Sequence, residues 1–383
     1  PARALSQPRE ASPLLAGGAR HYTPAVRIDQ VLPSLASRDA IGVHSLNLTA
    51  ALRAAGIDSD IYYGTSTPDV GHLGRPVTHL GRPERNRWLL YHASIGGPVY
   101  DAVAMRPEPK LVNYHNITPA HLLEGWAPQV TYEVSLGRAQ LERLAPESRL
   151  AVADSAYNES ELIEAGYQPT AVVPLLIDMT STGRQPDRAT AARLAEAKEA
   201  GGADFLYVGK ISPHKAPHDL VKMLAVYRRL YDPLARLHLI GGPLGDRYGP
   251  ALESFIARLD LGDAVDLVGS VDPAGLEAYF GAADAYLSAS DHEGFCVPVV
   301  EAMGHGIPVV AYGVTAVPET VGDAGILLDT KEPLRFAAAV ARVVEDAELR
   351  GHLAAAARRR VAHFDLAAST ERFVELLSSA VAA

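Results

Sequence analysis

The stretch that decides the fold reads EGFCVPVVEAMGHGIPVVA, residues 293–311. Two glutamates, Glu293 and Glu301, stand eight positions apart in it, around a predicted helix start. The preceding segment DAYLSAS (284–290) is predicted to be a buried strand, so Glu293 is expected on the loop at the carboxyl end of that strand. Pro298 suits the first helical position, where its missing N–H costs nothing. This start places Glu301 in the first helical turn.

Carboxylates therefore stand beside the free backbone N–H groups of a helix start. Those N–H groups attract anions, while carboxylates accept hydrogen bonds from hydroxyl groups. The layout suits a ligand that carries both a phosphate and a sugar. An ordinary helix fits the same spacing, with Glu301 complementing the helix dipole and Glu293 closing a loop. Spacing alone does not separate these two interpretations.

A second informative stretch is YVGKISPHKAPHDLV, residues 207–221. Only six of the 35 basic residues are lysines, and two of these, Lys210 and Lys215, stand close together here. Both fall at a predicted strand-to-helix turn, where two cations suit a diphosphate. The alternative is that both are solvated surface groups.

Strand and helix patterns alternate on both sides of these stretches, which predicts parallel sheets with helices on both faces. In the first half, AVRIDQVL (25–32) is predicted to be a strand and HSLNLTAALRAAG (44–56) a helix. The predicted division is a flexible arm at 1–24, an N-terminal Rossmann-like domain at 25–180, a linker with a surface helix at 181–204, a second Rossmann-like domain at 205–365, and a last helix at 366–383, for which packing back on the first domain is one option. In doubly wound folds ligands bind beyond the carboxyl ends of the strands, so the two domains are expected to face each other across a cleft.

Composition narrows the classes of protein. The 383 residues carry a net charge of −10, which argues against a nucleic-acid-binding protein, because such proteins present a basic face. A single cysteine fits a reducing, cytoplasmic location. No uncharged run predicts a membrane-spanning helix, and residues 1–24 lack the apolar segment of a signal peptide.

The ordered motifs over about 205–330, including FLYVGKISPHKAPHDLV, LIGGP and SASDHEGFCVPVVEAMGHGIPVVAYG, resemble the donor-binding domain of retaining family-4 glycosyltransferases of the GT-B fold. DAIGVHSLNLTAALRAAGIDSDIYYG and NYHNITP in the first half are similar to a less characterised branch of that family. The resemblance implies that 205–365 binds the nucleotide-sugar donor and that 25–180 is the acceptor side.

The resemblance also implies roles for matching positions in the second domain. Lys210 and Lys215 would hold the donor diphosphate and Glu293 the sugar hydroxyls. Many relatives have Arg where Lys210 stands, which weakens the expectation of bidentate phosphate binding there. The remaining implied contacts are the backbone N–H groups of Phe295, Cys296 and Val297 to sugar and phosphate, Glu301 to the ribose, and the backbone near Ser270 and Val271 to the base.

In the first domain the resemblance implies that the backbone at Gly42 approaches the phosphate and that His115 lies near the reacting sugar. Gly42 has the alternative of serving turn geometry alone, and His115 that of an ordinary loop histidine. His44, His92 and His121 are expected to be structural or surface groups. No histidine or cysteine group has the sequence spacing of a metal site, so no metal or other cofactor is expected.

The resulting prediction is a metal-independent, retaining glycosyltransferase. It would move a sugar from a UDP- or GDP-sugar to a saccharide, lipid-linked or natural-product acceptor, with no nucleic acid and no integral membrane segment involved. A phosphorylase or nucleotide-sugar hydrolase of the same fold is one alternative. A non-catalytic sugar-nucleotide-binding protein is the other. The sequence does not name the base, the sugar, the acceptor or the oligomeric state.

Overall fold

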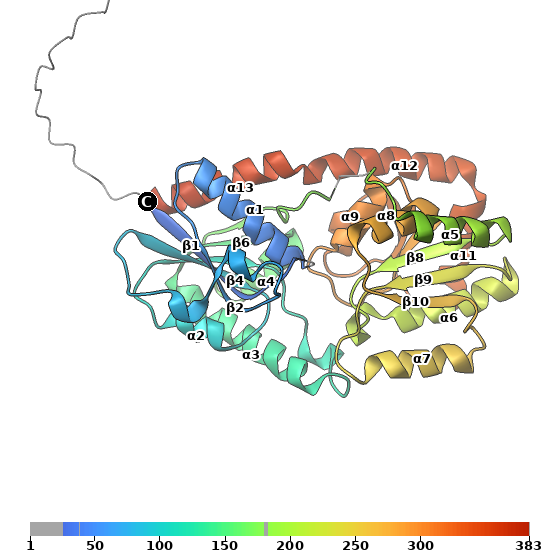
Figure 1. Ribbon diagram of the computed structural model, residues 1–383, viewed down its shortest axis with the longest axis horizontal. Helices are drawn as coiled ribbons and strands as arrows, with labels where there is room; N and C mark the ends of the chain where they lie inside the picture. The colour runs from blue at the N-terminus through green and yellow to red at the C-terminus, as the bar shows by residue number, and fades with distance from the viewer. Residues whose placement is uncertain (1–25, 38, 180–182, 383) are drawn as a thin grey trace, which may run out of the picture.

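The computed structural model describes residues 26–37, 39–179 and 183–382, and the arm predicted at 1–24 lies outside these ranges. Each half of the described chain forms one parallel sheet with helices on its faces, and the two halves lie end to end along the long axis of the molecule (Figure 1). The strands of the first sheet are β1 (Arg27–Leu35), β2 (Ile61–Ser66), β3 (Arg75–Pro76), β4 (Arg87–Ala93), β5 (Lys110–Tyr114), β6 (Ser148–Ala153) and β7 (Thr170–Val172). Those of the second sheet are β8 (Asp204–Val208), β9 (Arg236–Ile240), β10 (Val265–Gly269), β11 (Ala285–Ser288), β12 (Val309–Tyr312) and β13 (Gly325–Leu328).

Both sheets are doubly wound. The first has the order β3-β2-β1-β4-β5-β6-β7 and the second β10-β9-β8-β11-β12-β13. The strand order therefore reverses between β1 and β4 in the first sheet and between β8 and β11 in the second. In open α/β sheets the ligand crevice lies at such a reversal, outside the carboxyl ends of the strands.

The helices connect successive strands and cover both faces of each sheet. Those of the first half are α1 (Ala40–Ala54), α2 (Pro98–Ala104), α3 (Pro128–Leu144) and α4 (Ala156–Glu164). Those of the second half are α5 (Arg188–Glu199), α6 (Pro217–Leu230), α7 (Tyr248–Arg258), α8 (Pro273–Ala282), α9 (Val297–Gly304), α10 (Val317–Val321), α11 (Pro333–Glu345), α12 (Ala347–Val361) and α13 (Leu366–Ala382).

Alternation along the strands explains the two-sided burial. In β8, Phe205 and Tyr207 belong to the apolar cluster on one face of the second sheet, while Leu206 between them belongs to the cluster on the other face. All three are at most 2% exposed. A strand covered on both faces is apolar at every position, and this is why its sequence gives a continuous apolar run.

The last helix, α13, packs on the first domain, although the chain reaches it from the second (Figure 1). Phe373 and Leu377 of α13 are fully buried in one cluster with Ile28 of β1 and Leu48 of α1. Burying a large apolar side chain contributes about 1.5–3 kcal/mol. The helix therefore completes the core on one face of the first sheet.

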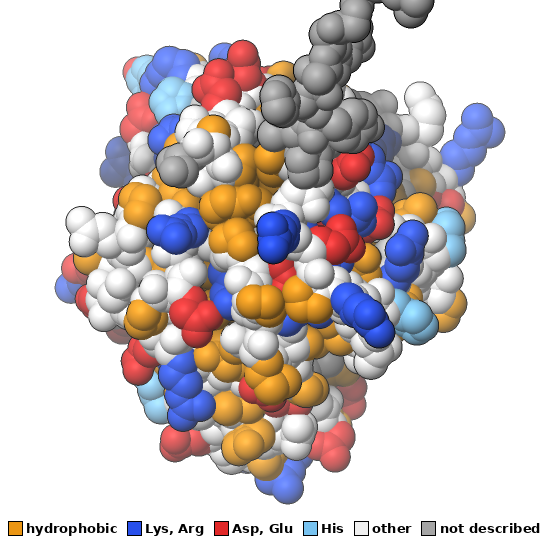
Figure 2. All heavy atoms as spheres, turned by 90° about the vertical axis from the view of Figure 1, so that its left-hand side faces the viewer, with side chains coloured by type: hydrophobic (Ala, Val, Ile, Leu, Met, Phe, Trp, Pro, Cys, Tyr) orange, Lys and Arg blue, Asp and Glu red, His pale blue; other side chains and the backbone are white. Residues whose placement is uncertain are grey.

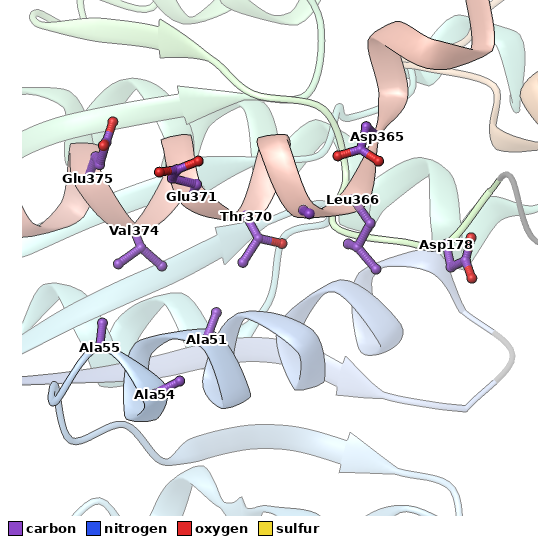
Figure 3. A pocket seen from close by; sticks show the side chains of 11 residues that line it. Ala51, Ala54, Ala55, Asp178, Asp365, Leu366, Thr370, Glu371, Val374 and Glu375 are labelled. Atoms are coloured by element: carbon purple, nitrogen blue, oxygen red, sulfur yellow. The ribbon is translucent and has the colours of Figure 1, made fainter.

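A shallow groove of about 910 Å³ runs between α1 and α13. Figure 3 shows the small side chains of Ala51 and Ala54 on α1 facing Thr370 and Val374 on α13, while Glu371 and Glu375 point away from α1. Asp178 of the linker between the domains also lines it, next to the start of α13.

Two element boundaries of the first domain differ from the prediction. The strand β1 continues past Pro33 to Leu35, because its pairing with β4 already ends at Val31 and the missing N–H of the proline is not needed there. The helix α1 begins at Ala40 and not at 44. Its first turn contains Gly42, a residue that usually disfavours helix.

Basic, acidic and apolar side chains are interspersed on the end of the first domain that faces the viewer in Figure 2. This face carries no broad basic patch. Within the described ranges, no helix combines the length and the apolar character needed to cross a membrane.

Candidate active site

The two predicted lysines lie on the loop after β8, one of the two strands at the reversal of the second sheet. Lys210 is exposed and directly follows Gly209 at the end of the strand, and Lys215 ends a short 3₁₀ helix (Pro213–Lys215) just before α6. Glu293 lies on the loop after β11, the other strand at the reversal. Lys215 Nζ is 2.6 Å from Glu293 Oε2. The fold therefore joins two sequence stretches, 78 positions apart, into one ion pair.

Glu293 is only 7% exposed, so its surroundings fix it closely. Its backbone N–H donates to Thr315 Oγ1 at 3.0 Å, and its carbonyl oxygen accepts from the N–H of Ala316. A buried carboxylate needs a cation or hydrogen-bond donors. Lys215 supplies the cation.

The helix α9 begins one residue earlier than predicted. It starts at Val297, so Pro298 is its second residue and Glu301 its fifth. The expectation that Glu301 lies in the first turn is therefore wrong: Glu301 lies in the second turn. Cys296 caps the helix in the left-handed conformation, with φ of 74°. A glycine would adopt this conformation without strain.

Burial is the main cause that raises the pKa of the Glu301 carboxyl, while His305 and Arg184 oppose it. Burial, followed by the charge of Glu293, raises the pKa of the Cys296 thiol well above its ordinary value. The thiolate is the nucleophilic form of cysteine, so Cys296 is a poor nucleophile in this position.

The other predicted donor residues lie on loops at the same edge of the second sheet. Phe295 and Cys296 are buried immediately before α9, and Val297 is its first residue. Ser270 and Val271 follow β10, ahead of the N-cap Asp272 of α8. The first N–H groups of α9 have no partners within the helix. Their contacts to a base, a sugar or a phosphate stay predictions.

Gly42 has a reason to be glycine that involves no ligand. A Cβ atom at this position would stand 2.2 Å from the carbonyl oxygen of Ala36. The absence of a side chain therefore permits the close packing of α1 on the loop that follows β1. The phosphate contact implied for Gly42 stays a prediction.

His115 follows β5 as predicted, but its side chain is only 1% exposed. Its Nδ1 lies 2.8 Å from Asp154 Oδ2, and its Nε2 lies 2.8 Å from His92 Nδ1. His92 Nε2 in turn is 2.9 Å from Gln30 Oε1. A hydrogen bond between a ring nitrogen of His115 and a sugar would replace one of these two contacts. Its catalytic role stays a prediction.

The hydrogen-bond partners of His92 determine which of its two ring nitrogens carries the proton. Burial, and then the charge of His115, lowers the pKa of His92 well below its ordinary value, so this ring is neutral with one N–H. The Gln30 oxygen takes that N–H, so His92 Nδ1 accepts from His115 Nε2. On the other side of the ring, His115 Nδ1 faces Asp154 Oδ2.

His44 joins this group from α1, with a ring nitrogen within 4.8 Å of ring nitrogens of His92 and His115. The sequence did not indicate the grouping, because the three residues come from separate elements. His44 Nδ1 accepts from the N–H of Leu176 at 2.9 Å, which leaves its proton on Nε2. A metal ligand needs a lone pair at the metal. In the observed arrangement, hydrogen bonds already use the lone pairs of His44 and His92.

Polar contacts join the two domains next to Glu293. His292 Nε2 lies 2.6 Å from Asn116 Oδ1, and Ser155 Oγ donates to the carbonyl oxygen of Gly294 at 2.7 Å. Sequence reasoning missed these four residues. Asn116 in NYHNITP and His292 in SDHEG are polar residues shortly after predicted buried strands, and this position was the signal that could have found them.

Glu319 of α10 adds a further contact across the domains. Its Oε1 and Oε2 each accept from the N–H of Ala156 at 2.9 Å, and Oε2 also accepts from the N–H of Tyr157 at 3.3 Å. These N–H groups belong to the first turn of α4, where partners within the helix are missing. A carboxylate of the second domain therefore caps a helix of the first.

The same fold occurs in solved glycosyltransferase structures. Anabaena HepE in complex with UDP-glucose superposes with a TM-score of 0.71 at 19% identity, over 92% of this chain and 99% of that one. Sucrose-phosphate synthase from Thermosynechococcus elongatus superposes with a TM-score of 0.72 at 20% identity, over 93% of this chain and 99% of that one. With its two facing doubly wound domains, the protein has the GT-B fold, as predicted.

Sequence comparison narrows this class to a family. The D-inositol 3-phosphate glycosyltransferase of Kineococcus radiotolerans is 32% identical over 281 residues, which are 68% of this chain and 63% of that protein. The enzyme of the same name from Geodermatophilus obscurus is 32% identical over 253 residues, 63% of this chain and 54% of that protein. The match thus covers less than two thirds of the length of either relative. Residues 190–360 match the family model of the glycosyl transferases group 1.

Proposed function

We propose that the protein is a retaining glycosyltransferase that moves a sugar from a nucleotide-diphosphate donor to an acceptor hydroxyl. The observation that carries the proposal is the ion pair between Lys215 and Glu293, placed at the reversal of the second sheet. A lysine there can hold a diphosphate, and a carboxylate beside it can hold the hydroxyls of the attached sugar. On binding, the donor would replace the ion pair between Lys215 and Glu293. Its diphosphate would contact Lys215, and its sugar would contact Glu293.

The proposed chemistry depends on stabilising the leaving diphosphate. Lys210, Lys215 and the free N–H groups of α9 would bear on the charge that develops on it. These groups supply positive charge without a metal ion, so the reaction is proposed to be metal-independent. Front-face attack assisted by the departing phosphate would retain the anomeric configuration without a protein nucleophile. The raised pKa of the Cys296 thiol agrees with this route.

The donor is proposed to be a UDP- or GDP-sugar. Support for uridine comes from HepE, which was solved with UDP, with UDP and glucose, and with UDP-glucose. The acceptor is proposed to be a saccharide, a lipid-linked sugar or a natural product that enters from the first domain. D-inositol 3-phosphate, named for the sequence relatives, is one acceptor to test. A cytoplasmic location is part of the proposal, because a single cysteine suits a reducing compartment.

Thermal unfolding with UDP, GDP, ADP, dTDP and CMP tests the donor site, with and without EDTA. A ligand at a hundred times its dissociation constant adds about 2.7 kcal/mol of stability, which raises the midpoint by several degrees in domains of this size. We expect UDP or GDP to give this shift, with EDTA having no effect. No shift with any nucleotide, or a shift that EDTA abolishes, would contradict the proposal.

The reaction is then tested with nucleotide-sugars that contain the nucleotide found to raise the unfolding midpoint. Transfer to an added acceptor, with the anomeric configuration of the product followed by NMR, is the expected result. An inverted product would overturn retention. Sugar release that depends on inorganic phosphate would show a phosphorylase, and release to water alone a hydrolase.

A further inference from the structure

The loop that carries Glu293 is held partly by its own domain. Lys331 Nζ is 2.7 Å from Asp291 Oδ1, and Lys215 Nζ is 2.6 Å from Glu293 Oε2. These two contacts stay in place however the two domains move relative to each other. They fix alternate residues of the segment DHEG, residues 291–294.

The other two residues of the segment, His292 and Gly294, are held by the other domain. His292 is 4% exposed, and its Nε2 lies 2.6 Å from Asn116 Oδ1. Gly294 offers its carbonyl oxygen to Ser155 Oγ at 2.7 Å. Glu293 therefore sits between two residues whose partners are present only while the domains are in contact.

Asn116 is set up to accept this hydrogen bond. Its Nδ2 donates to Asn158 Oδ1 at 2.9 Å and to Glu161 Oε2 at 2.8 Å, which fixes the orientation of the amide and turns Oδ1 toward His292. Its φ of 75° is left-handed, a conformation that asparagine tolerates better than most residues. The loop after β5 therefore presents one oxygen to His292 of the second domain.

His292 matches this acceptor. Burial, and then the charges of Arg138 and Lys215, lower the pKa of His292 to about 4. The ring is therefore neutral near pH 7, and because Asn116 Oδ1 can only accept, Nε2 must carry the proton. Gly294 is equally matched, since a Cβ there would stand 2.5 Å from the Cβ of Asn116. The contact leaves no room for a larger residue at this position.

We propose that Asn116 is a positioning residue which, by holding His292 across the cleft, couples closure of the two domains to the placement of Glu293 on the donor sugar. This inference rests on the proposed function for the role of Glu293, and goes beyond it by assigning the coupling. Closure excludes water from a reacting donor. The proposed hydrogen bond completes the sugar site only in the state that excludes water.

The first test replaces Asn116 by glycine, which keeps the left-handed backbone and removes the amide. Misplacement of a reacting group by about 1 Å can cost about 100-fold in rate. We expect Asn116→Gly to lower kcat for transfer by about 10- to 100-fold, to leave KM for the donor within about threefold, and to raise the ratio of donor hydrolysis to transfer. The matched control is Arg247→Ala, which also removes a contact between the domains, to the carbonyl oxygen of Gly125 at 3.2 Å, but at an exposed site away from the loop. It should change none of these quantities more than twofold.

A second pair of variants tests the same bond from the other side. His292→Phe keeps a ring against Tyr157, whose centroid lies 5.8 Å away, but removes the N–H. It should reproduce the effects of Asn116→Gly. His292→Gln restores a donor and should recover part of kcat and of the transfer ratio. If both His292 variants behave alike, or if Asn116→Gly lowers only the thermal midpoint, the positioning role is wrong.

Hydrogen exchange tests closure without any need for activity. The amides of Ala156 and Tyr157 are bonded to Glu319 only while the domains are in contact. In the presence of saturating UDP, Asn116→Gly should exchange these amides at least several-fold faster than wild type and Arg247→Ala. Equal protection in all three proteins would overturn the coupling. A wild type that transfers no sugar would count against the proposed function alone, because the exchange comparison still reports on the coupling.

Discussion

The polar groups at the carboxyl ends of the central strands are arranged in opposite ways in the two domains. In the second domain, Lys215 and Glu293 pair with each other at 2.6 Å. Under the proposed function, the donor diphosphate would replace Glu293 beside Lys215, and the donor sugar would replace Lys215 beside Glu293. In the first domain, His115 is shared between His92 and Asp154 and is 1% exposed. The two sheets have the same strand order, apart from the additional edge strand β7 in the first. The two domains therefore differ. In the proposed function a ligand would take over the contacts of Lys215 and Glu293, whereas both ring nitrogens of His115 are already hydrogen-bonded within the protein.

The largest effect that would test this comparison is expected at Glu293. Glu293→Gln keeps the shape of the side chain and removes its charge. Loss of one preorganised contact to the reacting part of a substrate costs about 100- to 1,000-fold in kcat, and we expect a loss of that size in a transfer assay. Glu253→Gln, an exposed glutamate of α7, is the matched control and should keep wild-type turnover. Unchanged turnover in Glu293→Gln would show that the Glu293 carboxylate does not act on the donor sugar.

The next effect is expected on stability, in the first domain. Asp154→Ala leaves the buried ring of His115 without its carboxylate partner. Breaking a buried pair by removing one partner costs about 3–5 kcal/mol, and urea unfolding should show a loss at the lower end of this range. Affinity for UDP, measured by calorimetry on the folded variant, should stay within about threefold of wild type, because the network lies in the other domain. A large loss of UDP affinity with little loss of stability would show that the His115–Asp154 network serves ligand binding and not stability.

A smaller effect is expected at Lys215, on binding. A hydrogen bond to a charged group contributes about 1.5–3 kcal/mol, so Lys215→Ala should weaken UDP about 30-fold. Lys210→Ala should act in the same direction. Lys222→Ala removes a lysine that pairs with Asp219 at 2.8 Å on α6, and it should leave UDP affinity unchanged. Equal affinities in the Lys215 and Lys222 variants would contradict the phosphate assignment.

The smallest effect concerns a buried histidine of the second domain. Burial alone would lower the pKa of His238, but the carboxylates of Asp204 and Asp266 raise it above its ordinary value. The resulting stabilisation is fully present below the unfolded-state pKa of about 6.5, and it is lost as the pH rises through the higher folded-state value. The stability difference between wild type and His238→Gln should therefore shrink between pH 6 and pH 9, by less than the Asp154 effect. A difference that grows with pH would show that the ring is neutral, like His92.

The parts of the site that could be predicted are those that depend on local order along the chain. Lys210, Lys215 and Glu293 each follow a buried strand, and parallel strands bring such loops to one edge of the sheet. The ion pair between Lys215 and Glu293 itself was not predicted from the sequence. The GT-B fold followed from the alternation of elements together with the resemblance of the motifs.

The parts that could not be predicted depend on contacts between distant elements. The direction of the His115 ring is decided by His92 of β4 and by Asp154, which directly follows β6. The early start of α9 depends on the left-handed conformation of Cys296, a conformation that favours glycine. Gly42 suggested a loop, yet it lies inside a helix. The reason for glycine at this position is the carbonyl oxygen of Ala36, which leaves no room for a Cβ atom.

The return of α13 to the first domain has a mechanical consequence. The chain crosses between the domains twice, once in the linker near Asp178 and once just before α13, at Asp365, and these two residues line the same groove. Two adjacent connections form a hinge, which permits rotation of the domains about one axis and resists twisting or sliding. Any opening of the cleft would then follow a single arc, and the loop of Glu293 would meet Asn116 in the same register each time the domains close.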